Sequence, residues 1–102
     1  MPSQPDPVSP EMYAMVLARD QYHCVAPVLD LNQLGTCSGR LEIDHVKSQL
    51  RIGKRAPSHP ENLVTLCSWH HRGMKAGSIW ATTKEHREWL RMYLEWANEI
   101  RA

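Results

Sequence analysis

Three cysteines and one histidine, at positions Cys24, Cys37, Cys67 and His70, constrain this 102-residue chain more than any other feature. A chain this short buries a small share of its surface, so its core gains from a cross-link. Three cysteines cannot all pair in disulfides within one chain. The C-x2-H spacing of Cys67 and His70 lets two ligands on one helical turn reach the same ion. We therefore expect a closed, structural Cys3His zinc site, with His23 as a reserve ligand; buried apolar cysteines are the alternative interpretation.

The composition excludes several classes of protein. Hydrophobic residues make up 42% of the chain, which is ordinary for a globular domain and too high for a disordered one. No apolar run approaches the roughly 20 residues that span a bilayer. Residues 1–8 hold three prolines and lack the basic and apolar regions of a secretory signal. We expect a flexible Pro-rich tail over residues 1–8, followed by a single domain over residues 9–102 that is monomeric, cytoplasmic and not bound to a membrane.

Helices are predicted near both ends of the chain. Ser9 is a good N-cap, and it is followed by proline and an acidic residue, which favours a helix over residues 10–19. Thr82 and Glu85 have the spacing of a capping box before a helix over about 83–100. We expect this helix to pack against the first through one apolar face, although its aromatic residues could instead stack on bases. The predicted face comprises Trp89, Tyr93, Trp96 and Ile100.

Two strands are predicted in the middle of the chain. Residues 41–46 alternate between apolar and polar, the pattern of a strand, and residues 62–66 form a second candidate. Between them, residues 47–60 are polar and read as a long loop. Residues 67–76 are compatible with a helix that closes at Gly77. The pattern as a whole indicates an α+β chain.

The amino-acid sequence of these central elements resembles that of the HNH endonucleases. LEIDHV (41–46), ENLVTLC (61–67) and C-x-x-H-H-x-x-x-K (67–75) carry the resemblance, which spans about residues 19–77. It implies a small ββα-metal (His-Me finger) domain, in which two strands and a helix surround one divalent ion. The core motif would occupy about residues 41–77. It would be cross-linked by the structural zinc site and flanked by N- and C-terminal helices.

The same resemblance implies the catalytic roles. His45 corresponds to the general base that deprotonates water, and Asn62 to the residue that orients it. Asp44 and His71 correspond to the ligands of the catalytic ion, for which Mg2+, Mn2+ and Ni2+ are all suitable. Successive side chains are about 100° apart around a helix, so His71 can serve this ion while His70 serves zinc.

Basic residues gather in the same part of the chain. The net charge of +1 argues against nucleic acid, but residues 40–75 hold seven basic and three acidic residues, a local balance of +4. The rest of the chain must then carry a charge of −3. His59 is a further candidate as an accessory ligand or phosphate donor. The predicted phosphate contacts are Arg72 and Lys75 beside His71, with Lys47, Arg51, Lys54 and Arg55 in the loop.

We therefore expect a metal-dependent DNA endonuclease with one active site per chain, which would nick DNA as a monomer. One alternative is a zinc-stapled module that binds nucleic acid without cutting it. Another is an accessory subunit of a DNA-packaging machine. Small HNH proteins resembling this one are often encoded by phages near the packaging terminase, which makes terminase a candidate partner.

Overall fold

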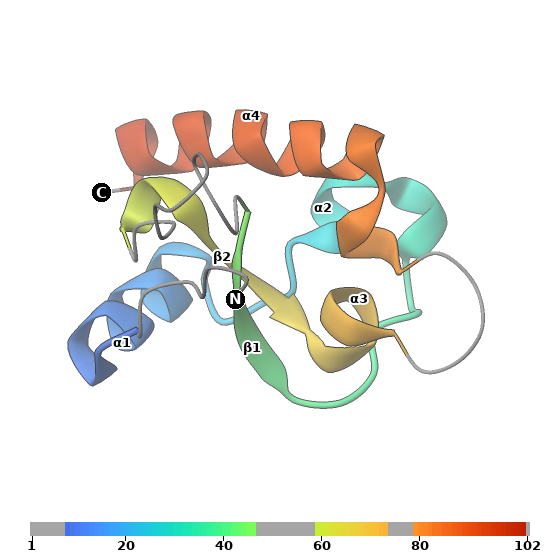
Figure 1. Cartoon of the computed structure of the whole chain (residues 1–102), viewed down its shortest axis with the longest axis horizontal. Coiled ribbons are helices and arrows are strands. Elements are labelled where there is room, and N and C mark those ends of the chain that lie inside the picture. The colour runs from blue at the N-terminus through green and yellow to red at the C-terminus, as the bar shows by residue number, and fades with distance from the viewer. Residues whose placement is uncertain (1–7, 47–58, 74–78, 102) are drawn as a thin grey trace, which may run out of the picture.

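The computed structural model describes residues 8–46, 59–73 and 79–101, and it is an α+β structure built on two strands. Strands β1 (Leu41–His45) and β2 (Leu63–Cys67) form an antiparallel ribbon in which Leu41 pairs with Cys67 and His45 pairs with Leu63. Helix α3 (Ser68–Arg72) follows β2 without a gap. Figure 1 shows the ribbon at the centre, with α1 at one end, α3 at the other and α4 along one side. Both predicted strands are confirmed, the second displaced by one residue.

Helix α1 (Pro10–Arg19) has the predicted bounds. The Ser9 hydroxyl accepts a hydrogen bond from the backbone N–H of Met12 at 3.1 Å, so the predicted cap forms. The helix ends where Gln21 and Tyr22 adopt φ values of 58° and 59°. This left-handed turn redirects the chain toward Cys24.

Helix α3 is shorter than predicted, because it ends at Arg72 and not at residue 76. Gly73 adopts φ 73°, and its N–H donates to the carbonyl of Trp69 at 2.8 Å. A Cβ on Gly73 would lie 2.9 Å from the side chain of Ile79. The backbone turn and the close approach of Ile79 both favour glycine at position 73, and the predicted closing residue, Gly77, lies outside the described residues.

Helix α4 (Lys84–Ile100) agrees with the predicted range, but its cap and its buried face differ. Its N-cap is Thr83, while Thr82 instead donates its hydroxyl to Ile79 within the 3-10 turn η3 (Trp80–Thr82). Trp96 and Ile100 are 47% and 63% exposed. The buried stripe is displaced by about one position and consists of Leu90, Tyr93, Leu94 and Ala97.

Two short helical turns form in the part of the chain between α1 and β1, and neither was predicted. Helix α2 (Ala26–Leu29) contacts α4, and the 3-10 turn η1 (Leu31–Gln33) contacts α2. Asp30 joins them, since its side chain accepts hydrogen bonds from the N–H of Asn32 at 3.1 Å and from the indole of Trp80 at 3.2 Å. These contacts tie the region before β1 to the turn η3, which precedes α4.

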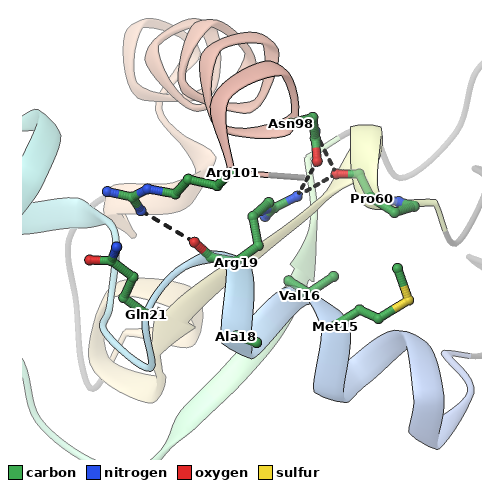
Figure 2. A pocket seen from close by; sticks show the side chains of 8 residues that line it. All are labelled: Met15, Val16, Ala18, Arg19, Gln21, Pro60, Asn98 and Arg101. Atoms are coloured by element: carbon green, nitrogen blue, oxygen red, sulfur yellow. Dashed lines mark hydrogen bonds between the residues drawn. The ribbon is translucent and has the colours of Figure 1, made fainter.

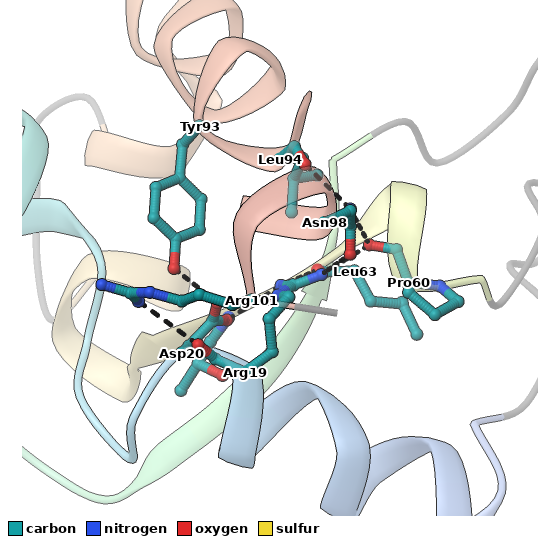
Figure 3. Close-up of polar contacts among 9 residues, drawn as sticks. Arg19, Asp20, Pro60, Leu63, Tyr93, Leu94, Asn98 and Arg101 are labelled. Carbon is teal, nitrogen blue, oxygen red and sulfur yellow. Dashed lines mark hydrogen bonds and ion pairs between the residues drawn. The ribbon is translucent and has the colours of Figure 1, made fainter. Parts of the chain in front are cut away.

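A buried ion pair at the end of α1 joins the remaining elements. The guanidinium of Arg19 lies 2.9 Å from the carboxylate of Asp20, and both residues are buried. Asp20 also accepts the N–H of Thr65 at 2.9 Å and the hydroxyl of Tyr93 at 2.6 Å, as Figure 3 shows in part. Buried charges are tolerated when they are paired and hydrogen-bonded in this way. Helix α4 therefore meets the end of α1 through polar contacts, and Tyr93 is the member of the predicted aromatic face that takes part in them.

The same arginine holds the segment that leads into β2. Arg19 donates to the carbonyl oxygens of Pro60 and Leu63, each at 2.6 Å, and Asn98 donates to Pro60 at 3.1 Å (Figure 3). These carbonyls lie on either side of Asn62, the last residue of the 3-10 turn η2 (Pro60–Asn62). The backbone around Asn62 is therefore held in place from α1 and α4.

A hollow of about 550 Å3 opens beside this network, between the end of α1 and the end of α4 (Figure 2). Arg101 crosses it and donates to the carbonyl of Arg19 at 3.2 Å. None of the residues predicted for the functional site contributes to it. The hollow is lined by Met15, Val16, Ala18, Arg19, Gln21, Pro60, Asn98 and Arg101.

Within the described residues, no helix combines the length and the apolar character needed to cross a membrane.

Candidate metal centres and functional site

Four side chains from separate parts of the chain meet in one Cys3His cluster that could hold a metal ion. Cys24 follows the left-handed turn after α1, Cys37 lies in the loop before β1, Cys67 ends β2, and His70 lies in α3. Their candidate ligand atoms all lie within 4.8 Å of one another. The Sγ atoms lie 3.5, 3.7 and 3.1 Å from His70 Nδ1, in chain order. Sulfur and imidazole donors in this number are typical of a structural zinc site.

The second nitrogen of the His70 ring has its own partners. Nε2 lies 2.9 Å from Oε1 of Gln33 and 3.1 Å from the hydroxyl of Thr36. An amide oxygen only accepts, so Nε2 carries the proton in this contact and Nδ1 is left with a lone pair directed at the sulfurs. This tautomer is the one that a metal ligand requires. Gln33 and Thr36 were not predicted, and nothing local in the sequence connects them to His70.

The three cysteines are free thiols whose protonation differs with their surroundings. Burial raises the pKa of the Cys24 thiol far above its ordinary range and also raises that of Cys37. Burial acts in the same direction on Cys67, but hydrogen bonds, first from the N–H of His70, outweigh it and lower its pKa. An ion that binds as a thiolate complex would therefore have to displace protons from Cys24 and Cys37.

The structure separates the two candidates for the fourth ligand. His70 is fully buried and lies among the sulfurs, whereas His23 is exposed and does not belong to the cluster. His59 is also exposed and belongs to no described group of metal-ligating residues. The geometry therefore favours His70 as the partner of the three cysteines.

The neighbouring histidine, His71, lies between two carboxylates of β1. Its Nε2 is 3.2 Å from Oδ1 of Asp44, and its Nδ1 is 2.8 Å from Oε1 of Glu42. The Asp44 carboxylate, assisted by Glu42, raises the pKa of His71 above its ordinary value. Glu42 and Asp44 are two residues apart on one strand and therefore share a face. The predicted pair of Asp44 and His71 is brought together, with Glu42 as an unpredicted third member.

One atom of this group stands out by its lack of a partner. Oδ2 of Asp44 is buried, and it accepts no hydrogen bond within the part of the chain that the structure describes. An unpaired buried carboxylate oxygen is costly, because nothing replaces the water it has lost. A divalent cation there would satisfy Oδ2, and His71 Nε2 could be its second protein ligand in place of the present contact with Oδ1. Asp44 and His71 therefore fit such an ion by their chemistry, and oxygen with one imidazole suits Mg2+, Mn2+ or Ni2+.

The other two predicted catalytic residues lie at the opposite end of the ribbon from the cysteines. His45 is the last residue of β1, is half-buried and pairs with Leu63 across the strands. Asn62 is buried, and its backbone carbonyl accepts the N–H of Val46 at 2.9 Å. This backbone contact places Asn62 opposite the end of β1, next to His45. The predicted strand over 62–66 placed Asn62 inside β2, but it belongs to the turn η2.

The predicted phosphate contacts are only partly visible. Arg72 is exposed and makes a two-pronged contact with Glu42, with Nη2 at 2.5 Å and Nε at 3.0 Å. Arg40 is 85% exposed and lines a shallow hollow of about 540 Å3 that also includes Glu42, His71 and Arg72. Arg40 is a further basic candidate beside His71. The other predicted contacts lie outside the described residues, namely Lys47, Arg51, Lys54, Arg55 and Lys75.

The sequence contains a signal that could have predicted Glu42 as a member of this site. It stands two positions before Asp44, so the strand alternation that predicts β1 also puts both carboxylates on one face. Burial alone would raise the pKa of Glu42, but hydrogen bonds from His71 and Arg72 hold it below its ordinary value. Glu42 therefore stays charged and can accept a hydrogen bond from Nδ1–H of His71.

Comparisons with known protein families, with curated proteins and with solved structures find no match to this chain. The case for its function therefore rests on its own residues and their geometry.

Proposed function

We propose that this chain is a metal-dependent DNA endonuclease of the HNH kind, which hydrolyses phosphodiester bonds at the Asp44–His71 centre. One observation carries the proposal. Asp44 and His71 come from two elements, lie 3.2 Å apart and present a buried carboxylate oxygen without a hydrogen-bond partner in the described structure. The two strands and the following helix that hold them are the elements expected of a ββα-metal domain.

In this mechanism His45 acts on the attacking water. Its ring accepts a proton from the water while the water oxygen forms a bond to phosphorus and the bond to the 3′ oxygen breaks. A histidine suits this step because its ordinary pKa lies close to neutral pH. Asn62 holds the adjacent backbone through its carbonyl contact with Val46 and would keep His45 at the end of the ribbon. A bound divalent ion would supply charge neutralisation for the phosphate and for the leaving oxygen.

The remaining features support a DNA substrate. Arg40 and Arg72 are exposed around the hollow beside His71 and are suited to phosphate oxygens. The Cys3His cluster would act as a structural zinc site that fixes α3, and through it His71, against β1. A role beside a phage terminase rests on the family resemblance alone and stays a prediction.

A non-catalytic nucleic-acid-binding module is the second candidate. The exposed arginines around the hollow favour it equally, because phosphate contacts serve binding and cutting alike. The two candidates differ at His45, for which a binding module has no chemical use.

The test is a plasmid-nicking assay on the zinc-loaded chain with Mg2+, Mn2+ or Ni2+. We expect nicking by the parent protein and a loss of roughly 100-fold to 10,000-fold in rate for His45→Ala. The matched control is His23→Ala, an exposed histidine outside both centres, which should nick at the parental rate. Equal inactivity of the parent and His45→Ala with all three ions, together with equal DNA binding, would support the binding module instead.

A further inference from the structure

Glu42 is the residue of the second centre to which the resemblance assigns no role. Its Oε1 lies 2.8 Å from His71 Nδ1, on the edge of the ring away from Asp44. The two nitrogens of an imidazole point in different directions. A metal ion on Nε2, between His71 and Asp44, would therefore be out of reach of a carboxylate bound at Nδ1. Glu42 can act on such an ion only through His71.

The position of Glu42 is itself fixed from the other side. Arg72 contacts both of its oxygens, Nε at 3.0 Å and Nη2 at 2.5 Å. The planar guanidinium binds a carboxylate in one orientation, which a single lysine charge would not impose. Glu42 lies in strand β1, and its side chain is only 15% exposed. The carboxylate is therefore held rigidly against the His71 ring.

The consequence concerns the tautomer of His71. A carboxylate faces each ring nitrogen, but the contact at Nδ1 is the shorter one, 2.8 Å against 3.2 Å at Nε2. A neutral ring therefore keeps its proton on Nδ1, toward Glu42, and presents the lone pair of Nε2 to Asp44. A lone pair and a carboxylate oxygen 3.2 Å apart repel each other unless a proton or a cation lies between them. The arrangement thus sets up two acceptors facing one position, which is the arrangement that a cation needs.

We propose that Glu42 is a positioning residue for the second metal centre: its carboxylate, oriented by Arg72, fixes His71 with Nδ1 protonated and Nε2 directed at an ion shared with Asp44. This inference rests on the proposed function, because it assumes that Asp44 and His71 bind a divalent ion. It assigns Arg72 a structural contact in addition to its predicted contact with phosphate. It also gives α3 a defined rotation relative to β1.

The experiment measures Mn2+ binding to the zinc-loaded full chain by titration calorimetry at one pH. We expect Glu42→Gln and Glu42→Ala to weaken Mn2+ binding about 10-fold to 100-fold, the usual effect of removing a carboxylate behind a ligating histidine. Zinc content and thermal unfolding should stay at parental values. Glu88→Gln is the matched control, since Glu88 is an exposed carboxylate on α4 that also pairs with an arginine; it should bind Mn2+ as the parent does.

A second readout is taken first on the parent protein, so its main outcome does not depend on a variant that folds. Nitrogen-15 NMR of the zinc-loaded parent without Mn2+ should show His71 protonated at Nδ1, and the Glu42→Ala spectrum should lose this preference. A neutral parent ring protonated at Nε2, or parental Mn2+ affinity in Glu42→Ala, would overturn the inference. Absence of any Mn2+ binding by the parent would overturn it as well. Failure of the proposed function looks different: Mn2+ binding would depend on Glu42 as expected, but the parent would not nick DNA.

Discussion

Two histidines that are adjacent in the sequence, His70 and His71, lie in opposite kinds of surroundings. His70 is fully buried, with three sulfurs at one ring nitrogen and Gln33 at the other. The His71 side chain is 24% exposed and lies between two carboxylates, beside a hollow lined by arginines. The first site provides four protein donors for an ion, whereas the second provides two and its side chains are partly exposed. A closed donor set suits a structural ion, and an open one leaves positions for water and phosphate.

The comparison also shows how one short helix can serve both centres. Helix α3 has five residues, and a helix rotates by about 100° per residue. Cys67, which caps this helix, and His70 therefore turn toward the cluster, while His71 turns toward β1. A slip of one residue at the start of α3 would exchange the two histidines and disrupt both sites.

The largest expected effect comes from breaking the closed site. His70→Ala should lose zinc to a mild chelator and lose cooperative unfolding, because the site's binding energy is also folding energy. Structural zinc contributes an apparent 10–16 kcal/mol, as an order of magnitude, in small zinc domains. Metal analysis and circular dichroism would measure both effects. A variant that keeps one tightly bound zinc per chain and unfolds like the parent would show that the cluster is not structural.

The intermediate effect comes from the neighbouring position. His71→Ala should keep one zinc per chain and shift the midpoint of thermal unfolding by less than about 5 °C, because the open site contributes little to the fold. The same variant should lose measurable Mn2+ binding and nicking. Calorimetry and the plasmid assay check these outcomes. Parallel loss of zinc in His71→Ala and His70→Ala would mean that the two sites are not independent.

The smallest effect is a pH dependence that belongs to the open site alone. The Asp44 contact raises the pKa of His71 above its ordinary value of 6.5. A group whose pKa is raised by folding adds stability that is complete below its unfolded pKa and is lost as the pH rises through its folded pKa. Without a second ion, the zinc-loaded chain should lose up to about 1 kcal/mol in this window. Urea unfolding at stepped pH should show the loss in the parent and not in His71→Ala.

Much of the local structure could be predicted because it depends on near neighbours in the chain. Ser9 and the following proline define the start of α1 at its observed position. The alternation of residues 41–46 predicts a strand, and the pairing of Cys67 with His70 follows from one helical turn. The end of α3 was harder to predict. The helix was expected to close at Gly77, whereas it ends at Arg72, and Gly73 turns the chain with φ 73°.

Signals between near neighbours were therefore enough to predict the candidate zinc ligands, the two strands and the opposite orientation of two adjacent histidines. Tertiary structure decided which surfaces meet. The buried pair of Arg19 and Asp20, the partner of Glu42 and the buried face of α4 all depend on contacts between residues far apart in the chain. The reason is physical: backbone geometry repeats over two to four residues, whereas the satisfaction of a buried charge depends on whichever distant groups packing brings to it.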